Sequence, residues 1–187
     1  MINKRIGPEK EMNVCIFKYS PFNAMVISAN DKGIVGLSFI SESDAMFVDE
    51  QSGSSISDGY ILDAVSQLRA YFSGNLKSFT LPLDLDCVSD FQKMVLVETV
   101  RIPFGEVRTY GEVALRIGKP GTARAVGGAL ARNPIGLVIP CHRVVAQDGQ
   151  LRGFSSPGGV TTKAELLIHE GVQVDHGKVM FNESGGK

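Results

Sequence analysis

The chain has 187 residues, of which 43% are hydrophobic and 21% are charged, and its formal net charge is −1. This length accommodates one large domain or two small ones, and the composition is ordinary for a soluble globular protein. No apolar run approaches the ~18 residues that span a bilayer, and the polar first ten residues lack the apolar stretch of a signal peptide. We therefore expect no membrane segment and a cytoplasmic protein, or a nuclear one in a eukaryote.

Three cysteines, Cys15, Cys87 and Cys141, are widely separated along the chain. An odd and sparse count without a secretory signal argues against a disulfide framework. Neither Cys-x-x-Cys nor His-x-x-x-His spacing occurs, and no Gly-rich phosphate loop is present. The sequence therefore predicts no metal site and no cofactor.

The net charge hides an asymmetry. Residues 101–171 contain nine Lys and Arg against five Asp and Glu, a net charge of +4, whereas the remainder contains ten against fifteen. A basic C-terminal half is typical of a protein that meets a polyanion. Chance scatter of surface charge gives the same count, so charge alone does not decide between the two interpretations.

The first 86 residues have the pattern of a small α/β unit. Strands are predicted at residues 14–17, 24–28 and 34–40, with a turn at residues 30–33. Residues 52–59 form a Ser/Gly-rich loop, and apolar residues at helical intervals predict a helix over residues 61–72, which Gly74 ends. We predict an N-terminal α/β domain over residues 1–86.

The rest of the chain has the pattern of a mainly helical unit. Apolar spacing and stop residues predict helices at residues 89–100, 110–117, 122–132 and 163–170. Ser89 is expected to cap the first helix and Gly171 to end the last. A buried strand is expected at residues 135–139. We predict a mainly α C-terminal domain over residues 87–175 and a tail over residues 176–187.

The second and third of these helices, joined by a tight turn, have the spacing of a helix-turn-helix. Helical hairpins that bind nothing share this spacing, so it does not by itself establish DNA binding. Gly127 and Gly128 lie inside the third helix, where each costs about 1 kcal/mol relative to Ala. Either close approach to DNA or tight packing between helices would compensate for this cost.

Cys141 follows Pro140, which favours an extended chain, so the cysteine is expected where the buried strand gives way to a loop. A free thiol is mostly protonated near neutral pH, and a nucleophile therefore needs a base or cation such as the adjacent His142 or Arg143. Neighbouring residues of an extended chain point opposite ways, so water could join His142 to the sulfur. Glu170 could orient the imidazole, and the pair is expected to lower the pKa of the thiol. A buried structural cysteine fits these residue types at least as well.

Several motifs resemble those of one family, the O6-alkylguanine-DNA alkyltransferases, also called methylated-DNA–protein-cysteine methyltransferases. Residues 140–144 (Pro-Cys-His-Arg-Val) resemble its active-site motif, and residues 123–129 (Ala-Arg-Ala-Val-Gly-Gly-Ala) resemble its recognition helix. Further matching segments, in the family's order and nearly its spacing, are residues 104–107, Thr109-Tyr110, Asn133-Pro134 and residues 166–171. The resemblance covers roughly residues 91–172, and before Asp86 it is one of architecture alone.

The resemblance implies a suicidal transfer in DNA repair. Cys141 would take a methyl or other alkyl group from O6-alkylguanine, with O4-alkylthymine as a second candidate, once per molecule and after base flipping. His142 would draw off the thiol proton through water, and Glu170 would orient His142. Asn133 would brace the turn around the reactive loop, and Tyr110 would help rotate the nucleotide and donate a hydrogen bond near the purine.

The resemblance also implies a monomer whose partner is double-stranded DNA containing O6-alkylguanine. Arg124 would enter the base stack, because a planar guanidinium can fill the gap that a flipped base leaves. Gly127 and Gly128 would let the recognition helix approach DNA, and Leu130 would pack against sugar and groove. The implied DNA-binding set is Thr109, Tyr110, Ala123, Arg124, Gly127, Gly128 and Leu130. The implied substrate pocket is Pro140, Phe154, Ser155 and Ser156, with Phe154 where the family often carries Tyr.

One segment departs from the family pattern. Residues 153–159 are two residues longer and carry an extra Ser-Pro element before Gly-Gly. This loop is expected to roof the pocket, so the size of the alkyl group it accepts and the serine that contacts the base stay open. Two other functions stay open as well. A non-catalytic lesion-binding relative would lack Cys141, and a cysteine hydrolase would need an oxyanion hole.

Overall fold

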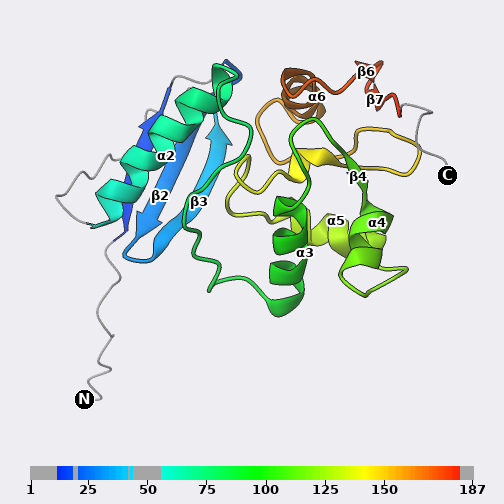
Figure 1. Cartoon of the computed structure of the whole chain (residues 1–187), viewed down its shortest axis with the longest axis horizontal. Coiled ribbons are helices and arrows are strands. Elements are labelled where there is room, and N and C mark those ends of the chain that lie inside the picture. Colours follow the sequence, from blue (N-terminus) through cyan, green and yellow to red (C-terminus); the bar gives the residue numbers. More distant parts are fainter. Residues whose placement is uncertain (1–11, 19–20, 42, 44–55, 182–187) are drawn as a thin grey trace.

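The computed structural model describes residues 12–18, 21–41, 43 and 56–181. A small sheet covered by one helix forms one side of the molecule, and a group of short helices and strands forms the other (Figure 1). Both sides contribute to one core of buried apolar residues. The predicted order, an α/β unit followed by a mainly helical one, is confirmed.

The sheet is antiparallel in the order β1-β2-β3, and its strands are β1 (Asn13–Phe17), β2 (Ala24–Asn30) and β3 (Gly33–Ile40). All three strands were predicted from the sequence. The turn between β2 and β3 is closed by Asn30, whose Oδ1 accepts hydrogen bonds from the backbone N–H of Lys32 (2.9 Å) and of Gly33 (3.2 Å). A short side chain that hydrogen-bonds to the backbone two residues on favours a turn at this point.

Helix α2 (Ile56–Phe72) lies across one face of the sheet (Figure 1). It buries Ala64, Leu68 and Tyr71 completely. The predicted helix is confirmed, but the predicted loop is wrong for residues 56–59, which form the first turn of α2, and residues 52–55 lie outside the described chain. Ser and Asp are common where helices begin, and packing on the sheet outweighs the cost of one glycine.

The second half contains α3 (Asp90–Val100), α4 (Tyr110–Arg116), α5 (Ala123–Ala131) and α6 (Val160–His169). Ser89 caps α3 as predicted, since its hydroxyl oxygen accepts a hydrogen bond from the backbone of Gln92. Gly171 follows α6 with a φ of 83°, in keeping with its predicted role as the stop. Helix α6 begins three residues earlier than expected. Among the described helices, none is long and apolar enough to cross a bilayer.

Short strands complete this half. Two of them, β4 (Arg108–Thr109) and β5 (Val144–Val145), pair in parallel, and two more, β6 (Val174–Asp175) and β7 (Lys178–Val179), form a hairpin. Val179 is 2% exposed and packs with Val145 and Leu167 in a second apolar cluster. The hairpin therefore crosses the boundary that the sequence suggested between residues 175 and 176.

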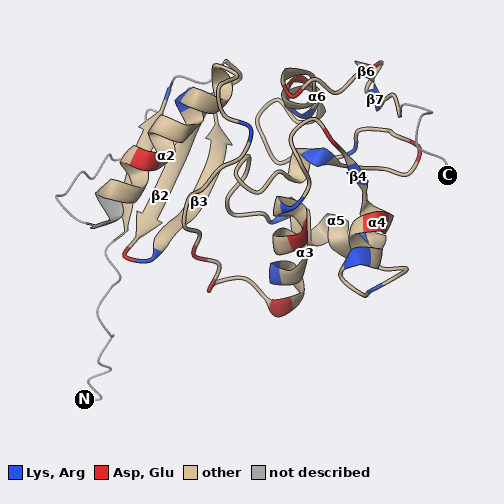
Figure 2. Ribbon diagram, viewed as in Figure 1, with Lys and Arg blue, Asp and Glu red and all other residues tan. Residues whose placement is uncertain are grey.

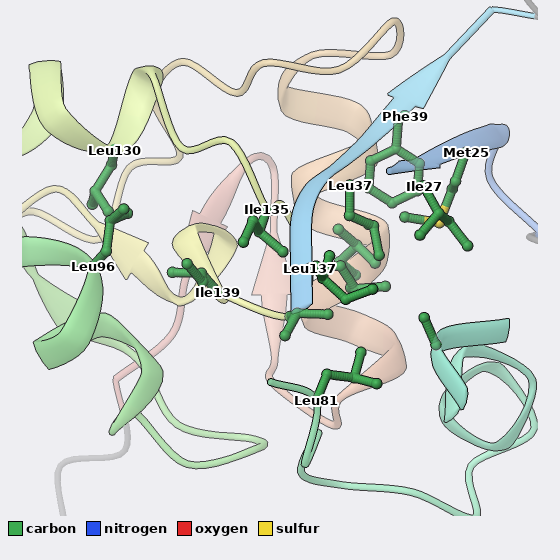
Figure 3. Close-up of a cluster of buried hydrophobic side chains, with 14 of the residues drawn as sticks. Met25, Ile27, Leu37, Phe39, Leu81, Leu96, Leu130, Ile135, Leu137 and Ile139 are labelled. Atoms are coloured by element: carbon green, nitrogen blue, oxygen red, sulfur yellow. The ribbon is translucent and has the colours of Figure 1, made fainter. Parts of the chain in front are cut away.

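The predicted buried strand at residues 135–139 is wrong. The segment is a buried turn, in which Leu137 has a φ of 68° and the N–H of Ile139 donates to the carbonyl of Ile135 (3.0 Å). A continuous apolar run is typical of any fully buried segment, so periodicity could not separate the two. Gly136 donates to the carbonyl of Leu37 (2.7 Å), and Figure 3 shows Ile135 and Leu137 beside Leu37 of β3. The turn thus joins the two halves directly before Cys141.

Candidate active site

Cys141 lies in a single 3-10 turn, η1 (Cys141–Arg143), directly after the buried turn. The N–H of Cys141 donates to the carbonyl of Ile139 (2.8 Å), and that of Arg143 donates to Pro140 (2.9 Å). The predicted position at the end of a strand is therefore replaced by two tight turns in series. Cys141 is half-buried and borders a cavity of about 740 Å³, which is also lined by Tyr110 and α5.

His142 and Glu170 lie together, as expected, and both are buried. Nε2 of His142 is 2.8 Å from Oε1 of Glu170. The other ring nitrogen, Nδ1, is buried and has no hydrogen-bond partner among the described residues. Buried polar atoms are rarely left without a partner, so Nδ1 marks a point where a water or a reacting group would bind.

Arg143 and Tyr71 surround the same carboxylate. Arg143 donates from Nε to Oε2 (2.7 Å) and from Nη2 to Oε1 (2.8 Å) of Glu170, while the Tyr71 hydroxyl donates to Oε1 (2.8 Å). Burial alone would raise the pKa of Glu170, but hydrogen bonds from His142 and Arg143 hold it well below its usual range. Glu170 is therefore an anion at neutral pH. Arg143 forms its ion pair with this carboxylate and not with the Cys141 thiol.

The predicted lowering of the Cys141 pKa is wrong. Burial raises the pKa of the thiol, and the opposing side-chain contributions come from a hydrogen bond with Asn133 and from the charge of Lys163. Burial likewise lowers the pKa of His142, against the pull of Glu170. The resting site therefore pairs a neutral thiol with a neutral imidazole, which leaves the imidazole free to accept a proton.

Lys163 was not singled out from the sequence, although it is a second buried cation of this site beside Arg143. Its Nζ donates to the carbonyl groups of Val144 (2.7 Å) and Arg152 (3.3 Å) and lies 5.8 Å from the centre of the Tyr110 ring. Burial lowers the pKa of Lys163 to about 8. Burial also raises the pKa of Tyr110, so this phenol keeps its proton and can donate a hydrogen bond into the cavity.

Asn133 holds the buried turn at both ends. Its Nδ2 donates to the carbonyl of Ile139 (2.9 Å), and its Oδ1 accepts from the N–H of Ile135 (3.1 Å). Together with its hydrogen bond to the Cys141 side chain, this links the shape of the turn to the sulfur. The bracing role that the resemblance implied is compatible with these contacts.

Helix α4 begins with a capping box beside the cavity. Thr109 Oγ1 accepts from the N–H of Glu112 (3.1 Å), and the N–H of Thr109 donates to the Glu112 carboxylate (2.6 Å). The next residue, Tyr110, borders the cavity. The cap therefore fixes where the chain turns into α4 and, with it, the position of this ring.

Helix α5 supplies another part of the cavity wall, through Ala123, Arg124, Gly127 and Leu130. Arg124 is exposed, whereas Leu130 is only 6% exposed and belongs to the core, which leaves little of it for a DNA sugar. A Cβ at Gly127 would lie 3.7 Å from the Tyr110 ring, and one at Gly128 would lie 3.8 Å from Arg132. Both distances are ordinary, so tight packing inside the protein does not require glycine at either position.

The long loop covers part of the cavity. Phe154 and Ser155 line it, and Ser155 Oγ donates to the carbonyl of Ala131 at the end of α5 (3.0 Å). Neither Pro140 nor Ser156 is among the lining residues, and the buried hydroxyl of Ser156 has no hydrogen-bond partner in the described chain.

Charge around the cavity is mainly positive. Arg124 and Arg152 both line it, and Figure 2 shows further basic residues on α4 and on the turn that leads to α5. Within the described residues, no group of three or more His, Cys, Asp or Glu side chains is placed to hold a metal ion.

Both halves of the chain match domains of one known protein family. The profile of the 6-O-methylguanine DNA methyltransferase DNA-binding domain matches residues 90–172, and that of the ribonuclease-like domain of the same family matches residues 14–85. The chain belongs to the 6-O-methylguanine DNA methyltransferase family.

Several relatives carry the name methylated-DNA–protein-cysteine methyltransferase. The one from Mycobacterium leprae is 39% identical over 163 residues, 87% of this chain and 95% of its own. The one from Methanosarcina barkeri is 42% identical over 153 residues, 79% and 90% of the two chains. The crystal structure of the Mycobacterium tuberculosis O6-methylguanine methyltransferase superposes with a TM-score of 0.72 at 36% identity, covering 86% of this chain and 93% of that one.

Proposed function

We propose that this protein repairs O6-alkylguanine in double-stranded DNA by moving the alkyl group onto its own Cys141. O4-alkylthymine is a second candidate substrate. The observation that carries the proposal is a half-buried cysteine that borders a cavity of about 740 Å³, next to a buried His142–Glu170 pair. Relatives that bear the name methylated-DNA–protein-cysteine methyltransferase, at 39% and 42% identity, support the same reaction.

The proposed step balances without a cofactor. Sγ of Cys141 attacks the alkyl carbon, the bond from that carbon to O6 breaks, and the thiol proton passes through water to Nδ1 of His142. The partnerless Nδ1 supports this route. Guanine leaves with its O6 electron pair and takes up a proton from water, which the protonated imidazole of His142 replaces, while Tyr110 in the cavity wall donates a hydrogen bond. The product is a thioether, which water does not cleave, so each molecule reacts once.

DNA would be bound by α4 and α5 acting as a helix-turn-helix. Arg124 would enter the stack in place of the flipped base, an idea supported by its exposure at the cavity wall. The ordinary distances around Gly127 and Gly128 support a second role for these glycines, namely close approach of α5 to DNA. A crystal structure of Mycobacterium tuberculosis OGT in complex with DNA, at a TM-score of 0.70 and 36% identity, supports a DNA partner for this chain as well.

The remaining proposals concern organisation. We assign residues 1–86 to an N-terminal domain, residues 87–175 to the reactive domain and residues 176–187 to a tail. The hairpin of β6 and β7 supports one change to this division, namely a reactive domain that extends to Val179 and a tail that begins after it. The protein would act as a monomer, in the cytoplasm or, in a eukaryote, in the nucleus.

Incubation with duplex DNA carrying labelled O6-methylguanine tests the function. We expect the label to reach a plateau at one methyl group per protein, and mass spectrometry to place it on Cys141. Several turnovers, or a methyl group on Cys15 or Cys87, would contradict the mechanism. A cysteine hydrolase would instead turn over a small ester or amide and leave the labelled DNA unchanged.

A further inference from the structure

Tyr71 belongs to helix α2 in the N-terminal half, yet its hydroxyl reaches the carboxylate of the reactive site. It donates a 2.8 Å hydrogen bond to Oε1 of Glu170, and the whole side chain is buried. We propose that Tyr71 is a positioning residue for alkyl transfer, which holds Glu170 in the orientation that His142 requires. This inference rests on the proposed function, and it gives the N-terminal half an indirect part in the reaction, through Glu170 and His142.

The Oε1 atom of Glu170 is crowded. Tyr71, Nε2 of His142 and Nη2 of Arg143 each lie 2.8 Å from it. A carboxylate oxygen offers about two lone-pair sites, so three donors must share them. The Tyr71 hydrogen bond therefore sets how much of the carboxylate charge remains for the imidazole, and from which direction.

Tyr71 is itself held on several sides. Its ring lies 5.4 Å from that of Phe79 and 5.1 Å from that of His169, centre to centre, with Phe104 edge-on at 6.1 Å. His169 Nε2 also lies 3.0 Å from the Tyr71 carbonyl. Tyr71 thus contacts two consecutive residues, His169 and Glu170, at the end of α6. A phenylalanine would make the same ring contacts, so the contact that only a tyrosine provides is the hydrogen bond from its hydroxyl to Glu170.

Removal of the Tyr71 hydroxyl should raise the pKa of His142. The carboxylate would then interact more strongly with His142, and a protonated imidazole would be stabilised. Among the described residues, the other charged groups that act on this pair are Arg143 on η1 and Lys163 on α6, and the titratable His169 packs against the Tyr71 ring. These are unchanged by a Tyr71→Phe substitution, so a shift in the pH profile reports on the hydroxyl alone.

The test measures single-turnover alkylation of the full-length protein by free O6-benzylguanine, which requires no DNA, from about pH 5 to 9. For Tyr71→Phe we expect a threefold to tenfold slower reaction near neutral pH, roughly the effect of one hydrogen bond. The acid limb of the profile should move up by about half a unit to one unit. Tyr60→Phe, on the same helix and half-buried, is the matched control and should match the unaltered protein.

Two further experiments test whether Tyr71 acts through Glu170. In a Glu170→Gln background Tyr71→Phe should shift the acid limb no further, and an additional shift of equal size would overturn the proposal. Equal rates and superimposed profiles for folded Tyr71→Phe and unaltered protein would overturn it as well. Should Tyr71→Phe fail to fold, NMR of the unaltered protein decides, since a slowly exchanging Tyr71 hydroxyl proton near the His142 ring is expected and its absence refutes the contact. If the unaltered protein does not react with O6-benzylguanine, the same comparison of variants is made with duplex DNA carrying O6-methylguanine, and lack of reaction with both substrates would refute the proposed function instead.

Discussion

The reactive region has two sides with opposite character. On the carboxylate side, Tyr71, His142, Arg143 and Glu170 are buried and joined by hydrogen bonds of 2.7 to 2.8 Å. The cavity side contains the half-buried Cys141 and the exposed Arg124, which both border a cavity of about 740 Å³. The buried side can only fix charge and orientation, whereas the open side can admit a substrate. The two sides should therefore fail differently when they are altered.

The largest effect is expected on the cavity side, at the sulfur. Cys141→Ala should abolish alkyl transfer, because no other described thiol borders the cavity. Binding of DNA that carries O6-methylguanine should survive, since the cavity walls are otherwise unchanged. Transfer of radioactive methyl groups and a gel-shift titration, run on the same preparation, measure the two properties. Cys87→Ala, at an exposed position, is the control and should retain full transfer.

On the carboxylate side we expect a loss of both stability and rate. Glu170→Gln leaves Arg143 charged and buried without its partner, which should cost about 3 kcal/mol of unfolding free energy. Transfer should also slow, and its acid limb should move to lower pH, because His142 loses the anion that favours its protonated form.

The loss of unfolding free energy in Glu170→Gln should depend on pH. The pKa of Glu170 is depressed in the folded protein, so its contribution is complete above the ordinary carboxyl value and is lost as pH falls towards the folded one. Denaturation curves of Glu170→Gln and of the unaltered protein should therefore converge in acid. Glu165→Gln, exposed on helix α6, which ends directly before Glu170, serves as the control. A constant difference at every pH would assign the loss to packing instead.

The features of the fold and site that could be predicted from the sequence are mostly those encoded by a few neighbouring residues. Helix α3 and its Ser89 cap, the hairpin at Asn30 and the Pro-Cys-His-Arg motif are all encoded within a few residues, and each was found. Tyr71 was missed because the partner of its hydroxyl is 99 residues away and no local pattern marks the pair. The buried turn before Cys141 was missed because a run of buried apolar residues carries no period.

The cavity side offers a smaller and more selective effect at Arg124. Arg124→Ala removes an exposed side chain, so the fold should be unaffected. Repair of duplex DNA should slow by about 30-fold, equivalent to roughly 2 kcal/mol, because nothing then fills the gap left by the flipped base. Reaction with free O6-benzylguanine needs no flipping and should be unchanged. Equal slowing on both substrates would remove the proposed role, and Arg101→Ala, an exposed arginine outside α4 and α5, provides the control.

The smallest expected effect is a change in the melting temperature of the alkylated protein, in which the cavity and the buried turn must both adapt to the added group. An alkyl group on Cys141 must fit between the cavity wall and the buried turn that Asn133 holds at Ile135 and Ile139. Overpacking of a well-packed site typically costs about 1–3 kcal/mol, which corresponds to a melting temperature lower by about 2–8 °C in a chain of this size. Differential scanning calorimetry before and after reaction with excess O6-methylguanine DNA measures the change. Cys141→Ala, treated identically, should not shift, and a spent protein that melts at or above the unreacted one would show that the site has room for the added group.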